Sequence, residues 1–145
     1  MNIRDFSEND LPAILDIYEK SKLDELLYES VQFQLLPLEK DEKRLRELLE
    51  SEIYVYEMVG VVAYCALFGS EIRALFVHPS ERGKGIGKIL LNYLLSKIDG
   101  SAILYVAKTN SPAKRLYEKY GFVVVEEFET TYNNISVLAN KMTRI

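Results

Sequence analysis

Arg82-Gly83-Lys84-Gly85-Ile86-Gly87 is the stretch of sequence that decides the fold. It lies between a β-rich run and a run, from Gly85 to about Ile98, whose apolar residues recur at helical spacing. Glycines let the backbone turn sharply and approach a ligand closely, and the first turn of a helix offers N–H groups without partners. The cations Arg82, Lys84 and Lys88 would oppose the helix dipole unless a strongly anionic ligand bound there. The segment therefore predicts a site for an anion such as a pyrophosphate.

The spacing of this segment excludes two common phosphate motifs. Its glycines follow G-x-G-x-G, whereas the dinucleotide fingerprint needs G-x-G-x-x-G and an acidic residue after the next strand, where this chain has Lys108. The mononucleotide loop needs Ser or Thr after Gly-Lys, but Ile89 follows Gly87-Lys88. Neither nucleotide motif fits.

The segments around this loop alternate between strand and helix patterns. Three β-rich runs separated by turn residues precede the loop and predict an antiparallel meander: Ile53–Glu57, Val61–Phe68 and Glu71–His78. Before them we expect a strand at Asn2–Phe6, a helix capped by Asn9 or Asp10, a short helix and loop over Lys22–Pro37, and an amphipathic helix over Leu38–Glu50. After the loop helix we expect a strand at Ser101–Ala107, a helix capped by Ser111, and the strand pair Phe122–Thr131 and Ile135–Met142 with Asn133-Asn134 in its turn. This order predicts one α/β domain over residues 1–145, with helices on the faces of a sheet of mixed direction.

Composition narrows the functional classes. A net charge of −4 argues against a general nucleic-acid binder, which needs a basic face. The single cysteine, Cys65, rules out an internal disulfide and a cysteine-based zinc site, so we expect no metal. The longest apolar stretch, around Val59–Phe68, is too short to span a bilayer, and no cationic leader precedes a long apolar run. We therefore expect a cytoplasmic protein that binds neither membrane nor nucleic acid.

Two blocks of sequence carry a resemblance to a known family. Arg82 to Gly87 completes the pattern Gln/Arg-x-x-Gly-x-Gly/Ala, and Asn110-Ser111-Pro112-Ala113 with Leu116 to Phe122 forms the second block at the expected distance. On these blocks the sequence resembles the GNAT superfamily of acetyl-CoA-dependent N-acetyltransferases; the N-terminal half matches only in the order of its elements. The resemblance implies a mixed, mostly antiparallel central sheet with helices on both faces and with strands four and five splayed to hold CoA.

The resemblance also assigns roles to individual residues. The cosubstrate would be acetyl-CoA, its pyrophosphate held by the loop residues Arg82, Gly83, Lys84, Gly85, Ile86, Gly87 and Lys88. The backbone at Phe76 and Val77 would pair with the pantetheine arm, and Asn110 would hydrogen-bond to it. Tyr117 would protonate the departing thiolate.

The acceptor amine needs a base, because an alkyl ammonium has a pKa of about 10.4 and must lose a proton before it attacks. In relatives that attack directly, the base is a glutamate on strand four, and counting back from Arg82 places it at Glu71. By simple alternation Glu71, Arg73, Leu75 and Val77 share one strand face, so Glu71 would face the cleft. Water and His78, the only imidazole, remain open as alternatives, while Cys65 is expected to be a buried apolar residue.

These observations predict an N-acetyltransferase that acts by direct attack in a ternary complex on a small primary amine or a protein amine. The alternative is a non-catalytic acyl-CoA-binding module of the same fold, for which neither Tyr117 nor Glu71 would be needed. A toxin that acetylates aminoacyl-tRNA would need a basic surface, which this acidic chain lacks. The acceptor is set by Lys22–Pro37 and the last strand pair, which carry no readable motif, and both a monomer and a homodimer fit.

Overall fold

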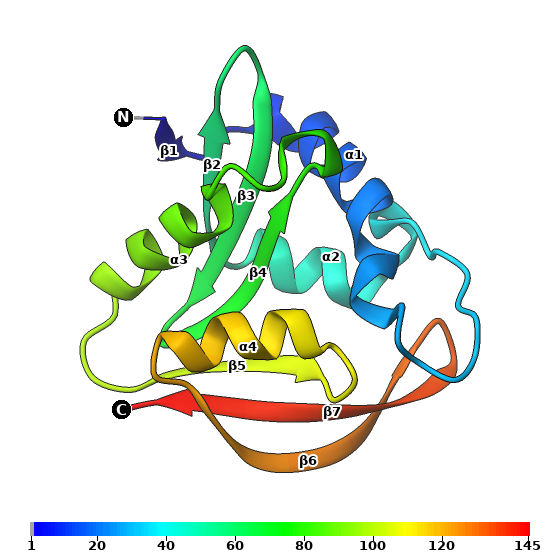
Figure 1. Ribbon diagram of the computed structural model, residues 1–145. Helices are drawn as coiled ribbons and strands as arrows, with labels where there is room; N and C mark the ends of the chain where they lie inside the picture. Colours follow the sequence, from blue (N-terminus) through cyan, green and yellow to red (C-terminus); the bar gives the residue numbers. More distant parts are fainter. Residues whose placement is uncertain (1) are drawn as a thin grey trace.

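A seven-stranded sheet runs through the computed structural model, which describes residues 2–145 (Figure 1). The strands lie in the order β1-β2-β3-β4-β5-β7-β6, and only β4 and β5 run parallel. Their bounds are β1 Ile3–Asp5, β2 Glu52–Glu57, β3 Val61–Phe68, β4 Glu71–Val77, β5 Ala102–Ala107, β6 Val123–Tyr132 and β7 Ile135–Arg144. The predicted mixed, mostly antiparallel sheet is confirmed.

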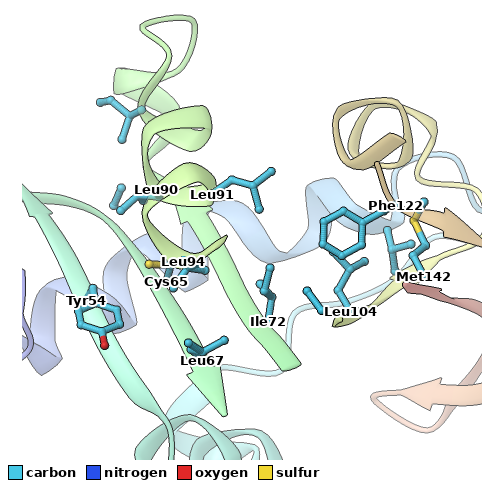
Figure 2. Packing of buried hydrophobic residues seen from close by; sticks show 14 residues of the cluster. Tyr54, Cys65, Leu67, Ile72, Leu90, Leu91, Leu94, Leu104, Phe122 and Met142 are labelled. Atoms are coloured by element: carbon cyan, nitrogen blue, oxygen red, sulfur yellow. The ribbon is translucent and has the colours of Figure 1, made fainter. Parts of the chain in front are cut away.

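Helices cover both faces of this sheet, as the sequence predicted. They are α1 Leu11–Ser21, α2 Glu42–Leu49, α3 Ile86–Ser96 and α4 Ser111–Lys119, with short 3₁₀ turns η1 Glu8–Asp10, η2 Lys22–Leu26, η3 Leu38–Lys40 and η4 Pro79–Glu81. On one face Leu90, Leu91 and Leu94 of α3 pack over Cys65 and Ile72 (Figure 2). On the other face α1 and α2 pack against β2, β3 and β4. Within residues 2–145 no helix is both long and apolar enough to cross a bilayer.

Local chemistry explains how several elements begin and end. Asn133 and Asn134 both have positive φ, 49° and 65°, which is the backbone of the two-residue turn expected between β6 and β7. The start of α4 differs from the prediction, because Asn110 and not Ser111 is the cap: its side-chain oxygen accepts a hydrogen bond from the Ala113 N–H at 3.4 Å. Asp41 likewise caps α2 by accepting from the Arg44 N–H, so the expected helix over Leu38–Glu50 is divided into η3 and α2.

The two parallel strands separate soon after they meet. Only Glu71 with Ile103 and Ile72 with Leu104 are paired, although β4 continues to Val77 and β5 to Ala107. Figure 1 shows the two strands diverging from this shared end. The predicted splay of the fourth and fifth strands is therefore confirmed, and the facing edges of β4 after Ile72 and of β5 after Leu104 are not paired with each other.

A β-bulge interrupts β4 at Arg73. Ala74 lies opposite Ala66 and Ile72 lies opposite Leu67, so Arg73 is an extra residue with no partner on β3. An extra residue shifts the alternation of side chains by one position. The side chains on the two sides of the bulge therefore follow different registers.

This bulge corrects the prediction that Glu71, Arg73, Leu75 and Val77 share one face. Leu75 and Val77 pack in the core beneath α3 and α4, together with Ile72. Glu71 precedes Ile72 and so projects from the opposite face, where Arg73 also contacts α2. Glu71 thus lies on the α1/α2 side of the sheet.

Candidate functional site

A cavity of about 820 Å³ follows the gap between β4 and β5 from the start of α3 to the start of α4. Backbone and side chains from both diverging strands, both helix starts and η2 form its walls. Of the residues predicted from the sequence, the walls include Phe76, Val77, Arg82, Gly83, Gly85, Ile86, Gly87, Lys88, Asn110 and Tyr117. Lys84 and Glu71 are not part of this wall.

The start of α3 is built to receive an anion. Gly83 and Gly85 have φ of 81° and 80°, a left-handed backbone that favours glycine. The first helical bond runs from the Ile89 N–H to the Gly85 carbonyl at 3.1 Å, so the N–H groups of residues 86–88 have no partner inside the helix. These residues line the cavity, and their N–H groups together with the helix dipole favour a phosphate there.

The three cations at this helix start are placed differently. Arg82 donates from Nε to the Val77 carbonyl at 3.3 Å and pairs through Nη1 with Asp24 Oδ2 at 2.6 Å. Lys84 pairs with Glu81 at 2.6 Å and lies outside the cavity wall. Lys88 lines the cavity and forms no ion pair with any residue in 2–145. Of these three cations, Arg82 and Lys88 are therefore the two that line the cavity beside residues 86–88.

The register of β4 decides which backbone groups face the gap. His78 donates its N–H to the Val62 carbonyl at 2.8 Å, and alternation then directs the backbone of Phe76 to Tyr64 on β3. Leu75 and Val77 therefore turn their polar backbone groups away from β3 and toward the gap. This corrects the expectation for Phe76, whose backbone is hydrogen-bonded within the sheet. The backbone of Val77 faces the gap, as the expected pairing with the pantetheine arm requires.

The half-buried ring of Tyr117 lines the cavity wall from α4. The ring packs edge-on against Phe122, with 5.8 Å between centroids. Burial raises the pKa of the Tyr117 hydroxyl above its usual value, so the phenol keeps its proton at neutral pH. It can act as a proton donor there.

A second cavity, of about 250 Å³, lies on the α1/α2 side of the sheet. Its walls include Glu71, Arg73 and Tyr64, with Tyr18 from α1 and Arg44 from α2. The two cavities share seven lining residues: Lys22, Glu25, Arg44, Leu75, Phe76, Tyr105 and Tyr117. The two cavities therefore adjoin where β4 and β5 separate, and Tyr117 lines both.

Of the candidate bases, only Glu71 lines this smaller cavity. One carboxylate oxygen of Glu71 lies 3.5 Å from Arg73 Nε. His78 lies elsewhere, with Nε2 at 3.7 Å from Asp16 and Nδ1 accepting from the Ser80 N–H. Cys65 is buried in the α3 core, and burial raises the pKa of its thiol to about 12.

Several residues that line the two cavities have no feature in the sequence that marks them as site residues. Glu25 lines both cavities and pairs with Lys22 at 2.7 Å, but both come from the segment over 22–37 that showed no clear period. Nothing in the sequence marks Tyr18 or Tyr64 as site residues. The packing of α1 against β3 and β4, and of η2 against β5, brings these groups together. No group of three or more His, Cys, Asp or Glu side chains within residues 2–145 is arranged to hold a metal ion.

Related sequences share parts of this chain. The peptidyl-lysine N-acetyltransferase YjaB of Salmonella typhimurium is 37% identical over 68 residues, which cover 47% of this chain and 46% of the relative. The chain thus spans less than half the length of that relative. The peptidyl-lysine N-acetyltransferase YiaC of Escherichia coli is 27% identical over 128 residues, covering 86% of this chain and 84% of the relative.

Solved structures share the whole fold. A GCN5-related N-acetyltransferase from Rhodopseudomonas palustris superposes with a TM-score of 0.79 at 16% identity, over 98% of this chain and 93% of the other. The structure of yncA from Salmonella typhimurium with its cofactor acetyl-CoA superposes with a TM-score of 0.68 at 21% identity, over 99% and 92%. Residues 50–124, just over half of the sequence, match the acetyltransferase (GNAT) domain. This segment contains β4, the glycine loop and α4, and the chain belongs to the GNAT acetyltransferase family.

Proposed function

We propose that this protein transfers the acetyl group of acetyl-CoA to an amine acceptor by direct attack in a ternary complex. The observation that carries the proposal is that a large and a small cavity adjoin at the splayed strands and that Tyr117 lines both. A cosubstrate and an acceptor can therefore approach one point from opposite sides of the sheet. The acetyl-CoA in the yncA structure and the lysine acceptors named for YjaB and YiaC agree with this chemistry.

The larger cavity suits CoA because it presents groups for two parts of the molecule, the pyrophosphate and the pantetheine arm. The free N–H groups of residues 86–88, with Arg82 and Lys88 beside them, would hold the pyrophosphate. A side chain at Gly87 would project into this cavity, so glycine there permits close approach of the phosphates. The backbone of Val77, which faces the gap, would pair with the pantetheine arm, and its N–H would stabilise the oxyanion of the tetrahedral intermediate.

The reaction then needs two proton transfers. The amine nitrogen forms a bond to the thioester carbonyl carbon, and Glu71 accepts the proton that the amine loses. As the intermediate collapses, the carbon–sulfur bond breaks and the Tyr117 hydroxyl gives its proton to the sulfur. The products are an acetylated amine and free CoA, and proton exchange with water returns Glu71 to its carboxylate form and Tyr117 to its phenol form.

A thiol-release assay with acetyl-CoA and a panel of amines tests the proposal. We expect CoA release that depends on both the protein and an amine, and tight CoA binding by calorimetry. Tight binding without release with any amine would contradict catalysis and would instead support the alternative, a non-catalytic acyl-CoA-binding module.

A further inference from the structure

The smaller cavity contains two buried hydrogen-bond donors that have no partner among residues 2–145: the Tyr18 hydroxyl and Arg73 Nε. The Tyr18 side chain is only 4% exposed. Arg73 Nε lies 3.5 Å from Glu71, too far for a good hydrogen bond. Buried donors are rarely left unpaired because the lost hydration costs free energy. Both donors therefore point to a ligand that brings hydrogen-bond acceptors into this cavity.

The charges around the cavity are separated into two ends. At the end beside Tyr18, Lys22 Nζ lies 5.9 Å from the ring centroid of Tyr18 and 5.4 Å from that of Tyr132, and the Arg44 guanidinium lies 5.0 Å from the Tyr132 ring. We call Tyr18, Lys22 and Arg44 the cationic end. Glu25 pairs with Lys22 and Asp41 with Arg44, but each cation keeps further N–H groups free for a ligand.

Carboxylates dominate the other end. Glu47 and Glu71 line the cavity there with Arg73, which is also held by Glu50 at 2.6 Å. The Glu47 carboxylate lies 3.9 Å from Lys43 Nζ. Three carboxylates therefore face two cations here, and the remaining negative charge of this acidic end favours a positively charged group. Glu71, the base of the proposed reaction, belongs to it.

The cavity is also small. Its volume of about 250 Å³ lies below the range of roughly 300–1,000 Å³ that drug-sized ligands occupy. A molecule the size of an amino acid fits this space. A lysine side chain from a protein would supply an ammonium group for the acidic end but nothing for the cationic end, and would leave Tyr18 unpaired.

We propose that the acceptor is a small zwitterionic amine, with its amino group at the acidic end beside Glu71 and a carboxylate or similar oxyanion bound by Tyr18, Lys22 and Arg44. This inference rests on the proposed acetyl transfer and names its acceptor class. Burial raises the pKa of Tyr18, so its phenol remains a neutral donor toward such an oxyanion.

The first test compares acceptors that differ only in the oxyanion. Each amino acid is compared with the amine that lacks its carboxylate: leucine with 3-methylbutylamine, and γ-aminobutyrate with propylamine. A lysine peptide with blocked ends represents a protein acceptor. Removal of the carboxylate should lower kcat/KM roughly 10- to 100-fold, because a hydrogen-bonded charge is lost. Equal rates within both pairs, or a lysine peptide that outperforms every amino acid, would overturn the proposal.

The second test uses Tyr18→Phe, with Tyr56→Phe as the matched control because Tyr56 lines neither cavity. Tyr18→Phe should lower kcat/KM about ten-fold for the preferred amino acid and leave that for its carboxylate-free partner unchanged. A purely structural role would lower both values together and would overturn the proposal. Thermal stability should not fall, since the hydroxyl has no partner to lose.

Calorimetry with CoA-saturated protein separates this inference from the proposed function. Binding of amino acids, but not of their carboxylate-free partners, without any turnover would support the acceptor class and contradict catalysis. Turnover of amines without preference for a carboxylate would support catalysis and contradict the acceptor class. If no member of the panel binds, the acceptor class is wrong.

Discussion

Gly87 lies beside Val77 in the wall of the larger cavity: a Cβ atom built on Gly87 would be in van der Waals contact with Val77, 3.9 Å from its Cγ2. Apart from its chain neighbours and the backbone of its own helix, no other heavy atom of residues 2–145 would lie within 4 Å. Gly87 has helical geometry with no positive φ, so a side chain there causes no backbone strain. Gly83 and Gly85 lack this property, because their left-handed backbone penalises any substitution. Gly87 is therefore the position at which CoA binding can be blocked without disturbing the fold.

We expect Gly87→Leu to weaken CoA binding at least 100-fold by calorimetry, because the new side chain would occupy the space beside the free N–H groups of residues 86–88. The melting temperature should stay the same or rise, since leucine is a better helix former than glycine by up to about 1 kcal/mol. Gly60→Leu is the control, because Gly60 has open space around it and lines neither cavity. Unchanged CoA affinity in Gly87→Leu would contradict the placement of the pyrophosphate.

Tyr117→Phe should lower kcat while CoA affinity and thermal stability stay nearly intact. The thiolate leaving group resembles that of a thiol with a pKa of about 8.5, so it can leave unprotonated and the acid is helpful without being indispensable. We expect a loss of about 2–3 kcal/mol in barrier, near the lower end of general acid catalysis. Tyr120→Phe, at the end of the same helix and outside both cavities, should keep full activity. Full kcat in Tyr117→Phe would show that this ring serves only packing.

Cys65 should not react with thiol reagents in the folded protein. Its side chain is fully buried, and burial raises the pKa of the thiol to about 12, so almost no thiolate is present at neutral pH. A chromogenic disulfide should detect no protein thiol under native conditions and one per chain in denaturant, since the chain has one cysteine. Rapid native labelling would contradict the burial and would also add background to the CoA-release assay.

Asp10 should make stability depend on pH. Arg4 binds both of its carboxylate oxygens at 2.8 Å and the Ser7 N–H donates to it, which lowers its pKa to about 2. Because the folded pKa lies below the unfolded one, this stabilisation is complete above about pH 4 and is lost as pH falls toward 2. Since Arg4 is partly exposed, we expect Asp10→Asn to cost about 1–2 kcal/mol at pH 7. Urea unfolding should show the gap to wild type closing as pH drops from 5 to 3; a constant gap would contradict this.

The sequence predicted those parts of the fold that depend on local pattern. The order of strands and helices, the glycine loop before α3 and the asparagine turn between β6 and β7 each follow from a few neighbouring residues. The bulge at Arg73 did not, because an extra residue in β4 becomes visible only when β3 is paired against it. That single insertion moved Glu71 to the other face of the sheet from the one expected.

The residues proposed to bind the acceptor could not be predicted from the sequence, for a similar reason. Tyr18 and Lys22 lie four residues apart, which is ordinary helical spacing, but Arg44 comes from α2 and no spacing links it to them. Their meeting around Tyr132 depends on how the N-terminal helices cross the end of β6. Asn110 illustrates the opposite case: the pattern located the start of α4 to within one residue, but hydrogen-bond geometry decided which residue caps it.

Glu71→Gln should lower turnover while leaving CoA affinity unchanged, because Glu71 lines only the smaller cavity. Loss of a general base costs roughly 10²- to 10⁴-fold, and the loss should be greatest well below the acceptor's pKa of about 10.4, where almost every amine must first be deprotonated. His78→Asn is the control: His78 lines neither cavity, so its kcat should match wild type at every pH. Steady-state rates from pH 6 to 9 separate the two variants. Wild-type rates in Glu71→Gln together with a loss in His78→Asn would reassign the base to the imidazole.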